Sequence, residues 1–363
     1  MSIEFVYATE ADNGRIHDLI RRTPQRGIAE LNFERKPDYF FGARVSTQSV
    51  MVILAIEKAS QEVVGIYSLG DRWVYVNGVK QNIRYASDLR IALQYRKGQL
   101  LPLIFEEIKK LDKGGEYVQS VILADNAASL TAMLRKSPGG PTYHPYLSMN
   151  TYVISTLFDR VSSLNLEVRR ATEHDVVRMQ ALFDVEAPKK QFYPVYDFAR
   201  IGVDPYYRDL QVSDYFLGFL DGELVGIIGT WNQKGFKQTR VVDYAGWMAA
   251  LRPFYNWWSC LFGGFPLPRK GHTVRYTGTH CLIIRDNDPV VFASILKAVR
   301  LDLRRKGEQT MIVGLCDNDP LRLAMDRFVH KIMRTNHYLG CYSGDPRVGL
   351  DKARPLYLDV ARL

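Results

Sequence analysis

Tyr85-Ala86-Ser87-Asp88-Leu89-Arg90-Ile91-Ala92-Leu93-Gln94-Tyr95-Arg96-Lys97-Gly98-Gln99-Leu100 joins a strand pattern to the start of a helix pattern. Apolar residues alternate up to Leu93, which predicts a strand over about 79–93. From Leu100 onward they recur three and four positions apart, which predicts a helix. The free N–H groups and the dipole of a helix start favour an anion. The basic turn before this helix therefore predicts a phosphate site, and an ordinary turn without a ligand is the competing interpretation.

Length and composition indicate a globular protein of two domains. The chain has 363 residues, 47% of them apolar and 24% charged, and this length exceeds the usual size of one domain. No apolar run approaches the ~20 residues of a membrane-spanning helix, and the N-terminus has no signal-peptide pattern. We therefore expect a cytoplasmic protein with no membrane contact. The cysteines show no CxxC spacing, so we expect neither a metal site nor a disulfide framework; they are Cys260, Cys281, Cys316 and Cys341.

Three short segments recur in the same order along the chain, which indicates an internal repeat. Thr9-Glu10-Ala11-Asp12 recurs as Thr172-Glu173-His174-Asp175, Val64-Gly65-Ile66 recurs as Val225-Gly226-Ile227, and Asp125-Asn126 recurs as Asp317-Asn318. We predict two copies of one mixed α/β domain, over 1–157 and 164–363. The third pair is farther apart in the chain than the first two pairs, which places an insertion in the second copy, at the aromatic stretch 247–271.

The order of these patterns is similar to that of the GCN5-related N-acetyltransferase superfamily. Leu89-Arg90-Ile91-Ala92-Leu93 resembles the family's donor-binding strand, and the turn up to Leu100 resembles its phosphate loop. The loop departs from the family pattern, because Tyr95 stands where the family has Arg or Gln and Leu100 stands where it has a small residue. Tandem members include the mycothiol synthases, the Eis-type aminoglycoside acetyltransferases, the N-myristoyltransferases and the Fem-type aminoacyl transferases, and the sequence does not place this chain among them.

The resemblance implies an N-acetyltransferase that uses acetyl-CoA as co-substrate and the amine of a small molecule or peptide as acceptor. It implies that strand backbone holds the pantetheine, that helix-start N–H groups hold the pyrophosphate and that basic side chains screen the phosphates. The net charge of +9 is compatible with such an anionic ligand, and scattered positive charges do not favour nucleic acid. The implied donor residues are Leu89, Ile91, Leu93, Arg96, Lys97, Gly98, Gln99, Leu100 and Asn126. For Asn126, capping of its own helix is the competing interpretation.

Acyl transfer to an amine requires a neutral amine and benefits from protonation of the leaving thiolate. We predict Asp88 as the base, because burial on the central strand would raise its pKa. The competing interpretation is a structural salt bridge to Arg84 or Arg90. Glu30 and Glu34 are reserve candidates.

The thiolate acid departs from the family pattern. The family often has Tyr seven residues after the position of Asn126, where this chain has Met133. We predict Tyr143 as the acid, with Tyr146 and His144 as alternatives, and packing is the competing role for each. The thiolate could also leave without an acid.

The second copy lacks the phosphate loop. Counted back from Asp317, Asn287-Asp288-Pro289-Val290 takes the place of Tyr95-Arg96-Lys97-Gly98. No glycine is present there, and Asp286 and Asp288 would repel a pyrophosphate. We therefore predict that only the first copy binds CoA.

Two other functions remain open in the sequence. The chain could be an inactive scaffold that senses acyl-CoA, or a Fem-like transferase that uses aminoacyl-tRNA through a basic, salt-sensitive groove. The basic turn at Arg96 favours CoA over tRNA. The insertion 247–271 could pack between the domains, line the acyl or acceptor pocket, or form the surface of an oligomer, and it is too short and too interrupted by Pro and Gly to span a bilayer.

Overall fold

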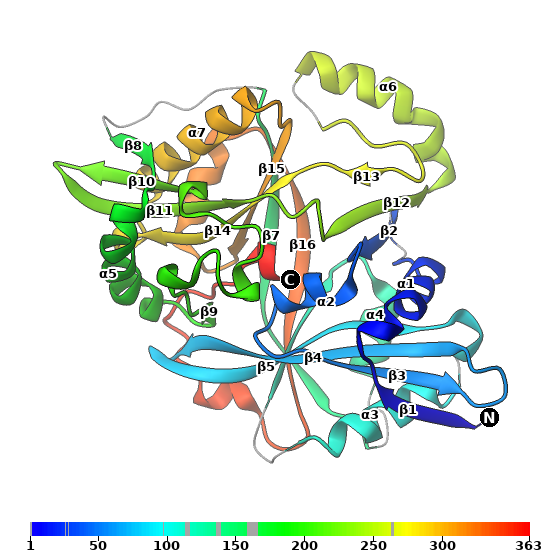
Figure 1. Ribbon diagram of the computed structural model, residues 1–363. Helices are drawn as coiled ribbons and strands as arrows, with labels where there is room; N and C mark the ends of the chain where they lie inside the picture. The colour runs from blue at the N-terminus through cyan, green and yellow to red at the C-terminus, as the bar shows by residue number, and fades with distance from the viewer. Residues whose placement is uncertain are drawn as a thin grey trace.

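One mixed sheet runs through both halves of the chain (Figure 1). The computed structural model describes residues 2–25, 27, 29–96, 98–112, 117–135, 139–157, 166–262 and 265–363. Within these residues the sheet has thirteen strands. Two sequence predictions lie outside the described residues: the role of Lys97 and most of the link between the two predicted domains.

The first half begins with a strand and a capped helix. Asp12 and Thr9 form a capping box ahead of the first helix, and Ile16, Leu19 and Ile20 of that helix are buried. Its elements are β1 (Ile3–Tyr7), α1 (Asn13–Arg22), β2 (Ala29–Glu34), α2 (Tyr39–Arg44), β3 (Met51–Glu57), β4 (Val63–Val76), β5 (Val79–Ile91), α3 (Leu100–Lys109), β6 (Val118–Leu123), α4 (Ala127–Leu134) and β7 (Thr142–Ser155).

The second half repeats this order and adds an excursion. Thr172 and Asp175 form the same capping box as Thr9 and Asp12, and the Asp221-Gly222 turn joins a hairpin at positive φ. Its elements are β8 (Glu167–Arg170), α5 (Val176–Glu186), β9 (Tyr193–Pro194), β10 (Tyr215–Leu220), β11 (Glu223–Trp231), β12 (Gln238–Tyr244), α6 (Gly246–Phe262), β13 (Thr273–Val274), β14 (Thr277–Ile284), α7 (Pro289–Arg305), β15 (Thr310–Cys316), a 3-10 helix over Pro320–Arg327 and β16 (His330–Cys341).

The strand order shows the repeat directly. The sheet runs β1-β3-β4-β5-β6-β16-β7-β15-β14-β11-β10-β8, and the thirteenth strand, β9, pairs with β4 beside this path. Counted inward from β1, the first half contributes β1, β3, β4, β5 and β6. Counted inward from β8, the second half contributes β8, β10, β11, β14 and β15, which are the equivalent strands in the same order. In both, the third and fourth strands pair antiparallel and the fourth and fifth pair parallel. A second small sheet, β13-β12-β2, takes one strand from the first half and two from the excursion of the second.

The two halves exchange their final strands at the centre of the sheet. β16, from the end of the second half, pairs with β6 of the first half, and β7 pairs with β15 of the second. β16 and β7 also pair with each other over their full lengths. The cores follow this exchange, because Ile154 of β7 packs in the second-half core and Tyr338 of β16 packs in the first-half core. Neither core is therefore complete without a strand from the other half.

Among the residues that the structure describes, no helix is both long and apolar enough to cross a bilayer.

We expect Ile154→Ala to lower the free energy of unfolding by about 2–5 kcal/mol, because Ile154 is fully buried and the substitution leaves a cavity. The control is Ile332→Ala on the neighbouring strand, where Ile332 is 54% exposed; we expect a change below about 0.5 kcal/mol. Urea unfolding, followed by tryptophan fluorescence and by circular dichroism, measures both. Two separate transitions for the two probes would contradict the interdependence of the halves.

Candidate functional site

The candidate site begins where the parallel strands β5 and β6 separate. Their pairing covers only three residue pairs, from Arg84 with Val118 to Ala86 with Ser120. Immediately beyond, β5 carries an extra residue relative to β4, and Asp88 takes the left-handed conformation with φ of 53°. The edges of β5 and β6 that face each other beyond this point no longer bond to one another. Such edges present backbone N–H and C=O groups that can bind an extended ligand. We call this region the first notch.

The second half has an equivalent notch, which the chain itself fills. β14 and β15 pair in parallel at only two positions, and Cys281 carries the matching bulge with φ of 51°. The end of the chain enters here: a Cβ on Gly314 would stand 2.9 Å from Cβ of Val360, and one on Gly278 would stand 3.7 Å from Cβ of Ala361. The backbone N–H of Leu282 donates to the Tyr357 hydroxyl at 3.2 Å.

In the described part of the first half, no helix packs against β5 as the chain end packs against β14. The loop after α1 does reach this region, because the Arg90 side chain of β5 donates to the Thr23 carbonyl oxygen at 3.0 Å and the Asn126 side chain donates to Gln25 at 3.4 Å. There, the elements packed extensively against β5 are its two neighbours in the sheet, β4 and β6. The two notches therefore differ in access although their strands match.

The helix starts beside the two notches also differ. At α3, Gln99 is the N-cap residue and makes no side-chain capping bond, and Gly98 before it is exposed. At α7, the N-cap residue Asp288 accepts hydrogen bonds from the backbone N–H groups of Val290 and Val291, at 2.7 and 3.3 Å. The Asp288 carboxylate thus occupies the place that an anionic ligand would take.

The two helix starts correct the residue of the first half that was matched to Asp288. Asp288 corresponds to Gln99, because each is the N-cap residue of its helix. Counting back from Asp317 had placed Asp288 opposite Arg96 instead. The count was wrong because the segments that follow the two helix starts differ in length.

The predicted donor residues that the structure describes lie along the edge of the first notch. Leu89 and Ile91 are in β5, Leu93 is exposed after the strand, and the Arg96 side chain donates to the Ile91 carbonyl oxygen at 3.0 Å. Gly98, Gln99 and Leu100 form the helix start. Asn126, at the end of the adjacent strand, is buried and caps α4 by accepting from the Ser129 N–H at 3.1 Å. Asn126 therefore caps its own helix, which was the alternative to a role in donor binding.

Asp88 is buried in an ion pair that the sequence did not identify. Its Oδ2 lies 2.7 Å from a guanidinium nitrogen of Arg35 and accepts from the Tyr39 hydroxyl at 2.8 Å. Burial alone would raise the pKa of Asp88, but the Arg35 and Arg90 guanidinium groups outweigh it and hold the pKa below its usual value. Asp88 is thus held as a carboxylate whose partner is Arg35, not Arg84 or Arg90 as the competing interpretation had it.

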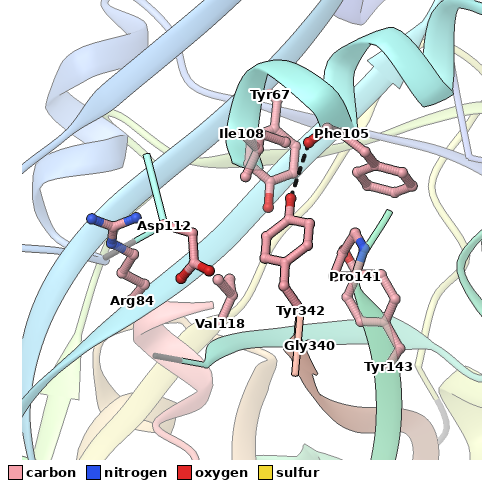
Figure 2. A pocket seen from close by; sticks show the side chains of 10 residues that line it. All are labelled: Tyr67, Arg84, Phe105, Ile108, Asp112, Val118, Pro141, Tyr143, Gly340 and Tyr342. Carbon is pink, nitrogen blue, oxygen red and sulfur yellow. Dashed lines mark hydrogen bonds between the residues drawn. The ribbon is translucent and has the colours of Figure 1, made fainter. Parts of the chain in front are cut away.

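Tyr143 lies in a different place from Asp88. It lines a small cavity of about 20 Å³ beneath α3, with Tyr67 and Phe105, and in this cavity the Tyr342 hydroxyl donates to the Phe105 carbonyl oxygen at 3.0 Å (Figure 2). Burial raises the pKa of Tyr143 far above its ordinary value.

Asp88 and Tyr143 contact opposite faces of the sheet. Tyr39, the partner of Asp88, interacts with Ser68, whereas Tyr143 lines its cavity with Tyr67. Neighbouring strand residues point to opposite faces. The structure therefore does not bring the two predicted catalytic residues together. Of the alternatives to Tyr143, Tyr146 packs edge-on against Phe192 and His144 lies 3.5 Å from Asp345.

Lys237 is a functional candidate that the sequence did not reveal. Its half-buried amine donates to the backbone oxygens of Ala361 and Leu363, at 3.1 and 2.6 Å. Burial and the Arg35 guanidinium lower the pKa of Lys237 to about 7, against an opposing effect of Asp88. Lys237 is therefore within electrostatic reach of the Asp88–Arg35 pair. No local motif marks such a lysine, because its environment comes from three distant segments.

We expect Asp88→Asn to lower the free energy of unfolding at neutral pH by about 3–5 kcal/mol, because it leaves Arg35 buried without its counter-charge. Since the folded pKa of Asp88 lies below its unfolded value near 3.8, this stabilisation is present above that value and is lost as pH falls. The gap between variant and wild type should therefore narrow below about pH 4. Urea titrations across pH measure it, with Asp18→Asn at an exposed carboxylate as control. A gap that is independent of pH would contradict the ion pair.

Comparisons with known proteins agree with this geometry at the level of the fold. No protein-family model matches the chain, and no curated protein matches its sequence. Among solved structures, the N-myristoyltransferase of Saccharomyces cerevisiae with bound myristoyl-CoA is similar at a TM-score of 0.60 and 11% identity, over 98% of this chain and 89% of that one. A GCN5-related N-acetyltransferase from Sphaerobacter thermophilus is similar at 0.54 and 11%, over 99% and 98%.

A third similar structure is a much longer chain. It is the GCN5-related glucosamine N-acetyltransferase region of a fungal multi-domain β-N-acetylglucosaminidase, with a TM-score of 0.62 and 11% identity. The match covers 93% of this chain and 38% of that one. At such identities a likeness shows the fold alone. Together with the repeated strand order and the paired notches, these matches show that the chain has the GCN5-related N-acetyltransferase fold, with the characteristic strand order present twice.

Proposed function

We propose that this protein is an acyl-CoA-dependent N-acyltransferase that binds its donor at the first notch and transfers the acyl group, acetyl in the simplest case, to an amine. The observation that carries the proposal is the difference between the two notches. The first has unpaired strand edges next to an uncapped, exposed helix start at Gly98. In the second, Val360 and Ala361 pack on β15 and β14, the Leu282 N–H donates to the Tyr357 hydroxyl, and Asp288 caps the helix.

The first notch has the groups that an acyl-CoA requires. The pantetheine arm has amides that can hydrogen-bond to the separated edges of β5 and β6, and the pyrophosphate is an anion that suits the start of α3. Helix geometry leaves the first N–H groups of α3 without intrahelical partners. Pro102 in the first turn supplies no N–H, so the donors come from residues ahead of it, including Gln99 and Leu100.

For the proton transfer we propose Lys237 as the base. A neutral lysine amine has two N–H bonds and one lone pair, and the oxygens of Ala361 and Leu363 can accept both N–H bonds. The lone pair is then the remaining site for a proton. With a pKa of about 7, a substantial fraction of Lys237 is neutral at physiological pH. The acceptor amine attacks the thioester carbonyl, its proton passes to Lys237, and the amide forms as the CoA thiolate leaves and is protonated.

Asp88 and Tyr143 have other roles in this proposal. Asp88 positions Arg35 and Tyr39, because a carboxylate whose pKa is lowered is a weak proton acceptor. Tyr143 packs beneath α3, on the opposite face of the sheet from Asp88. The thiolate then leaves without the tyrosine acid that the family often has.

We expect Gly98→Asp to weaken CoA binding about tenfold or more, because a carboxylate at the helix start repels the pyrophosphate by roughly 1–4 kcal/mol. A Cβ at Gly98 would meet only the Tyr95 carbonyl oxygen, at 3.5 Å, so the fold should tolerate the change. The matched control is Asn287→Asp ahead of α7, which should leave binding unchanged. Calorimetric titration with acetyl-CoA and CoA should find one site per chain. Equal losses in both variants would contradict the assignment of the donor to the first notch.

We expect Lys237→Met to lower kcat about 10²–10⁴-fold and to remove the rise of kcat/KM with pH near 7, because the base is lost. Release of CoA thiol, with an amine found by screening, measures both quantities. Lys234→Met is the control, since Lys234 pairs with Glu308 instead. A variant that binds CoA normally and keeps the wild-type pH profile would rule out Lys237 as the base without affecting the donor site.

A further inference from the structure

Helix α6 presents a row of large apolar side chains to water. Trp247, Leu251, Phe254 and Trp258 recur four, three and four residues apart, which places them on one face of the helix. They are 64%, 54%, 62% and 50% exposed, and the adjacent Trp257 is 59% exposed. We call these five residues the α6 stripe. They leave on the order of 600 Å² of apolar surface in water, at the upper end of what a typical monomer shows.

The opposite face of α6 is polar and binds the segment of the chain that follows the helix. The Arg252 side chain donates to the backbone oxygens of Leu267 and Pro268, at 3.0 and 2.9 Å. The Asn256 side chain both donates to and accepts from the backbone of Leu267, at 3.0 and 2.8 Å. An ordinary surface helix buries its apolar face and exposes its polar face, so α6 is reversed. Figure 1 shows α6 on the outer side of β12 and β13.

The chain around the α6 stripe is strictly basic. Between Asp243 and Asp286 there is no acidic residue, and there are five basic ones: Arg252, Arg269, Lys270, Arg275 and Arg285. Of these, Lys270 pairs with Asp243 at 2.6 Å, Arg285 pairs with Glu223 at 2.7 Å, and Arg252 lies on the polar face of α6. Arg269 and Arg275 carry the positive charge of this stretch. Lys331 of β16 adds a cation beside α6, because its ammonium lies 4.2 Å from the centre of the Tyr255 ring. Ile332 and Met333 follow Lys331 and are 54% and 37% exposed. The surface therefore combines apolar side chains with positive charge.

We propose that the α6 stripe docks the protein onto the surface of an anionic lipid bilayer. A helix with Trp, Phe and Leu on one face and basic residues around it lies in the interface plane, with its apolar side chains among the acyl chains and its cations at the headgroups. Tryptophan is favoured at this depth. The helix is not a spanning segment, and its polar face stays bound to Leu267 and Pro268.

A second copy of the chain fits this face less well. Its area is below the roughly 800 Å² per partner of a standard protein interface. Two copies joined through α6 would also bring two basic surfaces together, and acidic residues to pair with them are absent between Asp243 and Asp286. An anionic bilayer supplies the opposite charge.

Vesicle flotation tests the proposal. The probes are vesicles of phosphatidylcholine alone and vesicles in which phosphatidylglycerol replaces one third of it. The variant is the triple substitution Trp247→Ser, Phe254→Ser and Trp258→Ser, which removes three exposed side chains. The matched control is Trp73→Ser on β4, where Trp73 is 47% exposed outside the α6 stripe.

We expect the wild type to bind the anionic vesicles at least about tenfold more tightly than the neutral ones, with binding that weakens as salt is added. The triple variant should lose about tenfold or more of the binding, and Trp73→Ser should retain it. Thermal melting of each variant checks the fold. No binding by a folded wild type, or equal binding by the triple variant, would overturn the proposal. A concentration-dependent dimer that the triple variant abolishes, without vesicle binding, would assign the face to a second copy instead.

Discussion

The exchange of β7 and β16 is the constraint on which the rest of the structure depends. β7 and β16 bond to each other, and each also bonds to a strand of the opposite half, β7 to β15 and β16 to β6. The four strands β6, β16, β7 and β15 therefore include the last strand of each half. Through the exchange, Ile154 of β7 packs in the core of the second half and Tyr338 of β16 packs in the core of the first half. The parallel pairs β5–β6 and β14–β15 lie directly outside this centre. The two notches are therefore fixed in position by one set of hydrogen bonds.

This arrangement explains how two halves with the same strand order can differ in their chemistry. The second half contributes a strand, a core and the plug formed by Val360 and Ala361, and all three are structural. Its helix start can then be capped by Asp288 without loss to the fold, because a capping carboxylate stabilises a helix by about 1 kcal/mol. The first half has the uncapped helix start, and we infer that this lost stabilisation is the cost of leaving room for an anionic ligand.

Local patterns in the sequence predicted the fold well and the site only in part. The repeat of the Thr-Glu and Val-Gly-Ile segments, the strand that begins at Val79 and the helix that begins at Leu100 were confirmed, because each depends on neighbouring residues. The Arg35 partner of Asp88 and the environment of Lys237 depend on segments that are far apart in the chain, and no spacing rule marks them. The exchange of β7 and β16 was invisible for the same reason, since either pairing satisfies the strand pattern. α6 also lacks the long apolar run of a spanning helix, so run length alone does not mark it as a helix with its apolar face outward.

The long separation of β7 from its partners has a consequence for synthesis of the chain. Ser155 at the end of β7 pairs with Thr310, which emerges from the ribosome only after the whole excursion with α6 has been made. At roughly 5–20 residues per second this delay is on the order of ten seconds or more. During it, β6 and β7 present unpaired edges, which template aggregation. We therefore expect the nascent first half to need protection from aggregation, and mutations that slow translation of the second half should reduce the yield of folded protein even where they change no amino acid.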